Sequence, residues 1–152
     1  MTAYACALRL LGQRRLTEAQ LWQRLDRKGF GDAVIRETVE RAKHEGFVDD
    51  RLYAKLFVEG KRKAVGDARL VGELVRRGID GAAAAEAVRD LACGERERCA
   101  AAFESFKMKT PAIAYASVAR RLERLGFPAT TIYRVLREHA ATCGPLAGLV
   151  LE

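Results

Sequence analysis

Hydrophobic residues recur along the chain with helical spacing, and the pattern itself repeats. Three segments share a leucine, a basic turn, a glycine and a closing apolar residue; they are LDRKGF, LVRRGI and LERLGF. Their glycines are Gly29, Gly78 and Gly126, which stand about 48 residues apart. Apolar residues also stand four and eight positions before each glycine, and six and ten positions after it. This self-similarity predicts a tandem repeat.

Each repeat predicts a helix, a glycine stop and a second helix. The apolar residues before the glycine are one helical turn apart, as are those after it, so each pair marks the buried side of a helix. The glycine itself follows the last basic turn, where a left-handed cap needs a residue without a β-carbon. We expect the apolar residue after the glycine to pack back on the end of the helix.

A further helix precedes each of these pairs. Apolar residues at helical spacing predict helices over residues 3–13, 51–64 and 95–108. Thr17 and Gln20 have the spacing of a capping box, which predicts that the next helix begins there. Asp49 or Asp50 is expected to cap the helix that follows. The sequence therefore predicts nine helices in three groups of three.

The predicted fold is all-α, with three tandem three-helix repeats of helix-turn-helix type in an elongated, curved array. The expected boundaries are residues 1–46, 47–93 and 94–141, followed by a C-terminal tail over residues 142–152. The alternative is a single fused bundle. The array is preferred because units of under about 50 residues rarely bury enough surface alone and usually share interfaces with their neighbours.

Charge narrows the class of partner. The chain has 27 Lys and Arg against 20 Asp and Glu, a net charge of +7. No repeat is acidic, so a basic surface favours nucleic acid first and an anionic membrane second. The opening residues lack the basic start of a secretory signal, and no uncharged stretch reaches the roughly 18 residues of a membrane span. We expect a cytoplasmic protein that does not bind membranes.

Residue types that carry catalysis are sparse. His44 and His139 are the only histidines, and neither has a second ligand or a base at useful spacing. Phosphate-binding glycine loops and CxxC pairs do not occur, and four cysteines at positions 6, 93, 99 and 143 match no zinc pattern. Asp49 and Asp50 are adjacent, but a helix cap explains them better than a metal does. We expect no enzymatic activity, no cofactor and no metal.

What remains is a pattern of positive charge. Cations recur near the last turn of the three middle helices, and a further cluster is expected to end the fourth helix. Cations at helix C-termini are favourable by themselves, which explains one charge per helix better than a pair. Such arrays hold phosphates without reading sequence. The candidate contact residues are Arg27, Lys28, Lys61, Arg62, Lys63, Arg69, Arg76, Arg77, Arg120, Arg121 and Arg124.

The segment over residues 46–80 resembles the signature of the RecX family. It has a glycine, an aromatic and an aliphatic residue and two aspartates, then an aromatic–alanine pair, a phenylalanine, basic residues and a leucine–glycine–isoleucine close. These elements are Gly46, Phe47, Val48, Asp49, Asp50, Tyr53, Ala54, Phe57, Gly66, Leu70, Leu74, Gly78 and Ile79. The first repeat, with LTEAQLWQRLDRKGF, and the third, with VARRLERLGFPATTIYRVL, also resemble the family.

The resemblance implies tandem three-helix repeats and a function without catalysis. It implies inhibition of the RecA recombinase by binding the RecA–DNA filament, and a place in DNA repair, homologous recombination and the SOS response. We expect a monomer that touches single- or double-stranded DNA weakly and without sequence preference. Reversing the charges of Arg76 and Arg77 is then expected to weaken inhibition without unfolding the protein.

Two other hypotheses stay open. A DNA-binding protein of helix-turn-helix type, acting without RecA, would also be built from three-helix units. It would bind DNA directly with a steep salt dependence. The last alternative is a neutral helical scaffold whose basic pairs serve only as caps.

Overall fold

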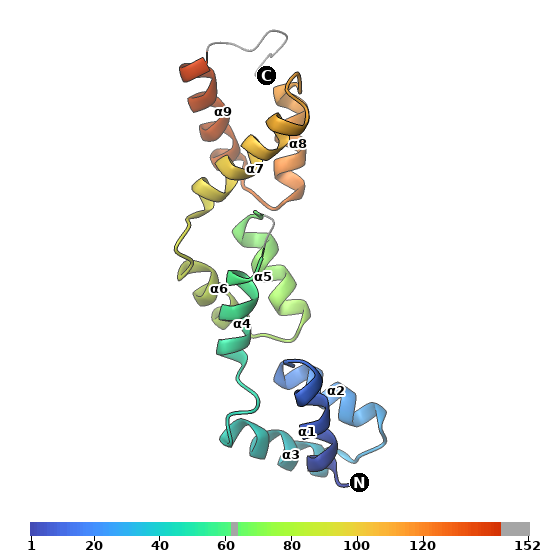
Figure 1. Ribbon diagram of the computed structural model, residues 1–152. Coiled ribbons are helices and arrows are strands. Elements are labelled where there is room, and N and C mark those ends of the chain that lie inside the picture. Colours follow the sequence, from blue (N-terminus) through green and yellow to red (C-terminus); the bar gives the residue numbers. More distant parts are fainter. Residues whose placement is uncertain (62–63, 144–152) are drawn as a thin grey trace. The chain divides into compact units, whose positions relative to one another are not determined.

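The computed structural model describes residues 1–61 and 64–143 (Figure 1). Nine α-helices and no strands occur within those residues, so the all-α repeated helical fold expected from the sequence is confirmed. In chain order they are α1 (Ala3–Gln13), α2 (Glu18–Arg27), α3 (Asp32–His44), α4 (Asp50–Glu59), α5 (Asp67–Arg76), α6 (Gly81–Arg89), α7 (Glu95–Lys109), α8 (Tyr115–Arg124) and α9 (Ala129–Cys143). None of these described helices combines the length and the apolar character needed to cross a membrane.

By packing, the chain forms two compact units. Unit 1 comprises residues 1–59 and 73–87, and unit 2 comprises residues 60–72 and 88–152. Residues 62–63 and 144–152 of unit 2 lie outside the described part, so the expected C-terminal tail is not described beyond residue 143. The three repeat boundaries stay a prediction, because this grouping reports packing and not sequence repetition.

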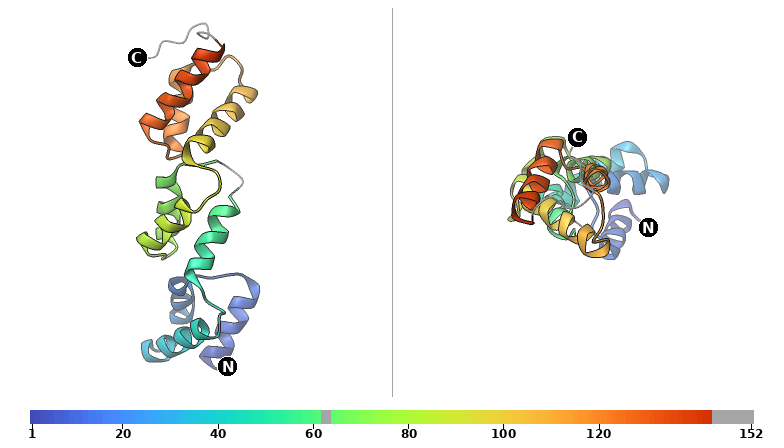
Figure 2. Two further views of the ribbon diagram at one scale, coloured as in Figure 1. Left: turned by 90° about the vertical axis from the view of Figure 1, so that its left-hand side faces the viewer. Right: turned by 90° about the horizontal axis from the view of Figure 1, so that it is seen from above.

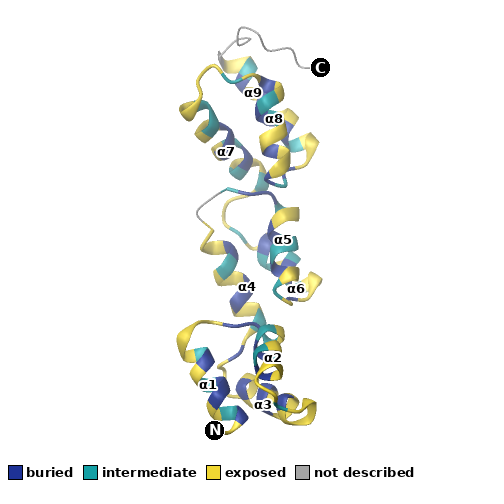
Figure 3. Cartoon of the chain, turned by 90° about the vertical axis from the view of Figure 1, so that its right-hand side faces the viewer, coloured by how far each residue is buried: buried dark blue, intermediate teal, exposed yellow. Residues whose placement is uncertain are grey.

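The core of unit 1 lies among its first three helices. α1, α2 and α3 pack on one another, and their buried residues line the sides that meet (Figure 3). Leu21 and Leu25 of α2 and Ile35 of α3 are fully buried, as the apolar spacing around Gly29 predicts. Trp22 and Phe30 pack against this cluster from its edge.

Unit 2 has the same organisation in its last three helices. α7, α8 and α9 pack on one another (Figure 2). Val118 and Leu122 of α8 are fully buried, and Ile132 and Leu136 of α9 are almost fully buried. These four residues occupy the same repeat positions as the buried residues of α2 and α3, so the repeat preserves its core.

The glycine stops expected from the sequence are confirmed. Gly29, Gly78 and Gly126 have φ angles of 91°, 90° and 90°, in the left-handed region. In each case the amide of the next residue donates back to the leucine four positions before the glycine; these bonds join Phe30 to Leu25 (3.4 Å), Ile79 to Leu74 (3.1 Å) and Phe127 to Leu122 (3.3 Å). This is the Schellman pattern, which satisfies carbonyls that the helix end leaves without partners.

The helix starts are also as expected, whereas one helix end is not. Thr17 and Gln20 form both bonds of the predicted capping box. The helix expected over residues 51–64 ends instead at Glu59. Gly60 follows directly, and glycine is less favourable than alanine in a helix by about 1 kcal/mol. Lys61 therefore lies beyond α4 and does not end it.

A close junction joins α2 to the end of α5 inside unit 1. The Thr17 hydroxyl donates to the carbonyl of Arg77 at 2.6 Å. The amide of Glu18, the first residue of α2, donates to the Asp50 carboxylate at 2.9 Å. A β-carbon on Gly78 would lie 2.3 Å from that of Ala19. Gly78 is therefore required both by its φ angle and by the neighbouring helix.

The same junction recurs inside unit 2, one repeat later. The amide of Gly66 donates to the carbonyl of Leu125 at 2.8 Å. The amide of Asp67, the first residue of α5, donates to the Glu95 carboxylate at 2.7 Å. A β-carbon on Gly126 would lie 2.6 Å from that of Arg69. Each junction thus joins a helix start, an acidic side chain and a glycine stop.

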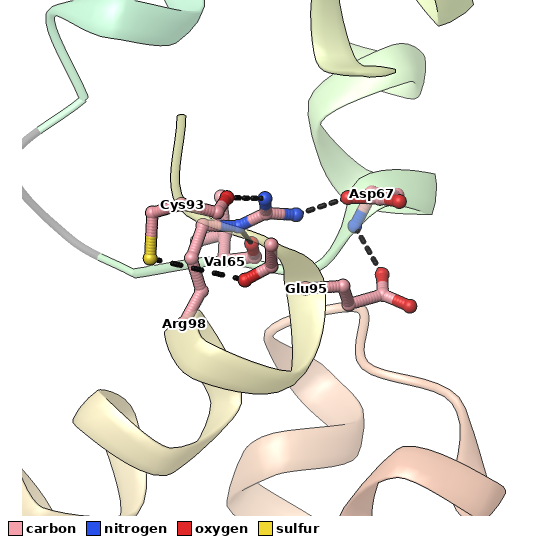
Figure 4. A network of polar contacts seen from close by, with 6 residues as sticks. Val65, Asp67, Cys93, Glu95 and Arg98 are labelled. Atoms are coloured by element: carbon pink, nitrogen blue, oxygen red, sulfur yellow. Dashed lines mark hydrogen bonds and ion pairs between the residues drawn. The ribbon is translucent and has the colours of Figure 1, made fainter. Parts of the chain in front are cut away.

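An arginine reinforces the second junction (Figure 4). The Arg98 guanidinium donates to the carbonyls of Val65 (3.1 Å) and Cys93 (2.8 Å) and is ion-paired with Asp67. Its side chain is only 11% exposed. One largely buried cation therefore fixes the loop before α5 against the start of α7.

Candidate nucleic-acid interface

Three arginines of α8 share its exposed side. Arg124 is four residues after Arg120 and three after Arg121, so it is a surface neighbour of both. Tyr115, Val118 and Leu122 on the opposite side are buried, and this burial turns the arginines outward. We call Arg120, Arg121 and Arg124 the α8 arginine face.

The α8 arginine face has no acidic partner within the described residues. The Arg121 guanidinium lies 5.6 Å from the Phe106 ring centroid. Arg69 approaches the same helix end, where its Nη1 donates to the carbonyl of Arg124 at 3.2 Å. Within the described residues, the three arginines of the α8 arginine face can therefore meet phosphates in a partner without first breaking an ion pair.

The same positions are less basic in the other middle helices. At the positions of Arg120, Arg121 and Arg124, α2 carries Gln23, Arg24 and Arg27, whereas α5 carries Gly72, Glu73 and Arg76. Among the middle helices, α8 is thus the one on which these three positions are all cationic.

In unit 1 the candidate cations divide into exposed and packed residues. Arg27, Lys28 and Arg76 are exposed at helix ends. Arg77 is half-buried, with its guanidinium 4.4 Å from the Phe57 ring centroid and its Nη1 donating to the carbonyl of Glu73 at 3.0 Å. Reversing Arg77 would therefore disturb packing as well as charge, and Arg76 alone is the cleaner variant.

The remaining candidate cluster is only partly described. Lys61 is exposed, just beyond α4. Arg62 and Lys63 lie outside the described residues. Arg69, the fourth member, lies in the first turn of α5 and is exposed.

The family-motif residues lie mostly at the first junction. Asp49 accepts from the amide of Leu52 at 3.1 Å and so caps α4, while Asp50 accepts from α2. Tyr53 is buried and stacks on Phe57 with ring centroids 6.4 Å apart. Gly46 has a φ of 82°, and the Phe47 side chain after it is 49% exposed. Phe47 is the motif residue whose conformation leaves a large apolar side chain on the surface.

The two histidines and the buried Cys99 lie in different surroundings. His44 is the last residue of α3, and its side chain is exposed. His139 is buried, and its Nδ1 lies 3.0 Å from the Tyr115 hydroxyl. Burial raises the pKa of Cys99 to about 11, so that thiol stays protonated. The described residues contain no group of three His, Cys, Asp or Glu side chains that could hold a metal ion.

Two arginines on α9 were not predicted from the sequence as contact residues. Arg134 and Arg137 are exposed and line an open hollow with Tyr133. The signal was available in the repeat, because the matching positions of α3 are Glu37 and Glu40. The hydrophobic pattern is the same in both helices, so the spacing of the core residues does not reveal this difference in surface charge.

Comparisons with known proteins point to one family. A family model described as "RecX, first three-helix domain" matches residues 3–41. The "Regulatory protein RecX" of Thermobifida fusca is 32% identical over 143 residues, which cover 90% of this chain and 77% of that protein. The protein of the same name from Caldanaerobacter subterraneus is 43% identical over 75 residues, which span 49% of this chain and only 38% of that relative's length.

The fold has a counterpart among solved structures. The crystal structure of RecX from Lactobacillus salivarius matches with a TM-score of 0.80 at 18% identity, covering 90% of this chain and 93% of that one. At this identity the likeness concerns the fold alone.

Proposed function

Because this chain belongs to the RecX family, we propose that it is a regulatory protein that inhibits the RecA recombinase by binding the RecA–DNA filament. In this proposal its basic helix faces lie near the DNA, and it has no catalytic activity of its own. Binding would block filament growth or the movement that couples ATP turnover to strand exchange.

The α8 arginine face is the observation that carries the proposal. Three neighbouring guanidinium groups without acidic partners among the described residues form a surface suited to phosphate oxygens. Such contacts position a protein on a nucleic acid without reading its sequence, which suits a regulator that must act on any filament. Arg69, bonded to the end of α8, extends the same positive charge.

The titration that tests the proposal follows the single-stranded-DNA-dependent ATPase of RecA. This protein is added well below one molecule per RecA. Strong inhibition at that ratio is expected, because a filament is disabled by few bound molecules whereas masking free DNA requires near-saturating amounts. Absence of inhibition even at excess would remove RecA as the partner.

The alternative is a DNA-binding protein of helix-turn-helix type that acts without RecA. The observation in its favour is that α7, α8 and α9 form a three-helix unit with a basic exposed side. A gel shift in the absence of RecA separates the two functions. Sequence-selective retardation would favour the alternative, whereas weak, salt-sensitive and unselective binding agrees with the first proposal.

A further inference from the structure

The exposed side of α4, in unit 1, combines two large apolar side chains with two cations. Leu52 and Leu56 are 38% and 41% exposed and lie one helical turn apart. Arg51 and Lys55 are also one turn apart, and both are exposed. Each cation directly precedes one of the leucines, so the two pairs run side by side along the helix. We call these four residues the α4 face.

The other first helices of the repeats, α1 and α7, lack the two leucines. Each of the three helices has a pair of consecutive buried residues by which they align; the pairs are Cys6–Ala7, Tyr53–Ala54 and Ala102–Phe103. The positions of Leu52 and Leu56 are exposed in all three helices. In α1 and α7 they carry small or polar residues; these are Ala5, Arg9, Ala101 and Ser105. The repeat therefore packs without large apolar side chains at these positions.

The two cations of the α4 face are not explained by the stability of the helix. Arg51 lies in the first turn of α4, where the positive end of the helix dipole disfavours a cation. Neither Arg51 nor Lys55 has an ion pair within the described residues. The neighbouring carboxylates of Asp49 and Asp50 accept bonds from backbone amides at helix starts. Both cations are therefore available to acidic groups of a partner.

We propose that the α4 face docks an acidic, amphipathic helix of a partner protein. Apolar residues of that helix lie on Leu52 and Leu56, and its carboxylates bind Arg51 and Lys55. A helix that presents apolar residues one turn apart matches the spacing of the two leucines. Carboxylates beside those residues complement the cations, and such charge complementarity selects the partner and its direction. This contact goes beyond the proposed function, because it needs no nucleic acid.

Other occupants of the α4 face fit its residues less well. Nucleic acid would bind the two cations and leave Leu52 and Leu56 in water. An anionic membrane attracts cations and apolar residues alike, but Glu59 is exposed four residues after Lys55 and would be repelled by lipid phosphates. Helices that lie on a membrane also present a whole apolar side, whereas the α4 face has two leucines. A protein helix uses both the apolar and the cationic half of the surface.

The α4 face differs from the α8 arginine face in how its contacts respond to salt. Contacts of α8 with phosphates are electrostatic, so they weaken steeply as the salt concentration rises. Contacts with Leu52 and Leu56 depend on the burial of apolar surface, which salt does not screen. Binding at the α4 face is therefore expected to be the less salt-sensitive of the two.

The test uses a synthetic peptide and contains neither RecA nor DNA, so its result is independent of whether RecA is inhibited. The probe is a fluorescein-labelled helical peptide of about 18 residues, with leucines one turn apart and glutamates beside them. Its anisotropy reports affinity for the full chain. Leu52→Gln/Leu56→Gln is expected to weaken binding about ten-fold or more, because two apolar contacts are lost.

The matched control for the leucines is Val34→Gln/Val75→Gln, which changes two apolar residues of unit 1 that are 47% and 48% exposed. Glutamine suits a helix, so both double variants are expected to keep the wild-type circular dichroism spectrum. The control is expected to bind the peptide like the wild type. Equal losses of affinity in the two variants would overturn the proposal.

Charge is tested by Arg51→Glu/Lys55→Glu. This variant is expected to bind the acidic peptide about five-fold more weakly, and to bind more tightly a peptide in which lysines replace the glutamates. Its matched control is Arg14→Glu/Arg15→Glu, which makes the same charge change at two exposed residues of unit 1. An equal loss in the control would overturn the proposal, since the peptide would then report net charge alone.

Two further results would overturn the proposal by assigning the α4 face to another occupant. Sedimentation of the chain with phosphatidylglycerol vesicles, lost in Leu52→Gln/Leu56→Gln, would mean that this surface binds lipid. A dimer of the wild-type chain in sedimentation velocity, dissociated by the same variant, would mean that a second copy occupies it. The proposal predicts neither: the leucine variant is expected to change peptide binding only.

Discussion

Thr17 and Gly66 occupy the same position in successive repeats, directly before the middle helix, yet they build their junctions in different ways. Thr17 reaches the carbonyl of Arg77 with its side-chain hydroxyl. Gly66 has no side chain, and its backbone amide itself bonds the carbonyl of Leu125. A β-carbon on Gly66 would lie 2.1 Å from the carbonyl oxygen of Gly126.

The difference shows that the repeat preserves a connection and not a residue. In unit 1 a hydroxyl spans the gap, so the two backbones can stay apart. In unit 2 the backbones meet directly, and only glycine fits between them. The second junction also has Arg98 to hold its loops. The two junctions should therefore fail differently under substitution.

Gly66→Ala is expected to give the largest loss of stability. The added methyl meets backbone that cannot move aside, and the bond to Leu125 is strained, so the free energy of unfolding should fall by about 3 kcal/mol or more. Urea unfolding followed by far-ultraviolet circular dichroism measures the loss. Gly72→Ala is the control: its β-carbon would meet nothing within 4 Å, so it should stabilise α5 by roughly 0.5–1 kcal/mol. Equal effects of the two variants would refute the close approach.

Gly78→Ala and Gly29→Ala separate the two reasons for a glycine stop. Both glycines have φ near 90°, which costs an alanine about 1–2 kcal/mol. A β-carbon on Gly29 meets nothing within 4 Å, whereas one on Gly78 meets Ala19 at 2.3 Å. Gly78→Ala should therefore cost about 3 kcal/mol in total, and Gly29→Ala only the strain. Thermal unfolding of both variants tests the ranking, and a costlier Gly29→Ala would reverse it.

Thr17→Val should lower the free energy of unfolding by about 2 kcal/mol. It keeps the shape of the side chain but removes the bond to Arg77 and the cap on Gln20. Thr2→Val is the matched control, because Thr2 caps α1 by accepting from the amide of Ala5, a bond that stays within the first turn of its own helix. It should lose only about 1 kcal/mol. Similar losses of stability in the two variants, measured by urea unfolding, would mean that the hydroxyl bond across the junction does not contribute to stability.

The smallest effect concerns pH and unit 2. Burial lowers the pKa of His139, and the Lys107 charge lowers it further, while Glu104 opposes them. The folded protein therefore binds this proton less readily than the unfolded chain, whose histidine has a pKa near 6.5. The free energy of unfolding is therefore unaffected by His139 above about pH 6.5, and it declines as the pH falls from there toward the lower pKa of the folded state.

His139→Phe is expected to flatten this decline, measured as unfolding free energy between about pH 7.5 and pH 5.5. The control is His44→Gln, which removes an exposed histidine and should leave the decline in place. A decline that persists in His139→Phe would assign the pH dependence to other groups.

Features that depend on residues close together in the sequence could be predicted from it. The leucine stripe, the glycine stops and the Thr17 capping box depend on residues within a few positions of one another. The junctions were not predictable, since the bond from Glu18 to Asp50 spans 32 residues and that from Asp67 to Glu95 spans 28. Nothing in their spacing distinguishes these acidic residues from ordinary helix caps.

The candidate site shows the same division. The α8 arginine face follows from helical periodicity, because Arg120, Arg121 and Arg124 oppose the buried leucine of the same helix. The packed role of Arg77 was missed, since its contact with Phe57 depends on how α4 meets the end of α5. Arg134 and Arg137 were missed for another reason: they sit on a helix whose core pattern repeats while its surface charge does not.

The most direct test of the account compares two triple variants as inhibitors of the single-stranded-DNA-dependent ATPase of RecA. Arg120→Glu/Arg121→Glu/Arg124→Glu reverses the α8 arginine face, and Arg9→Glu/Arg14→Glu/Arg15→Glu makes the same charge change at exposed residues of unit 1. The α8 variant is expected to need about ten-fold more protein for half-inhibition, whereas the control is expected to inhibit nearly as well as the wild type. Equal inhibition by the two variants would contradict the account.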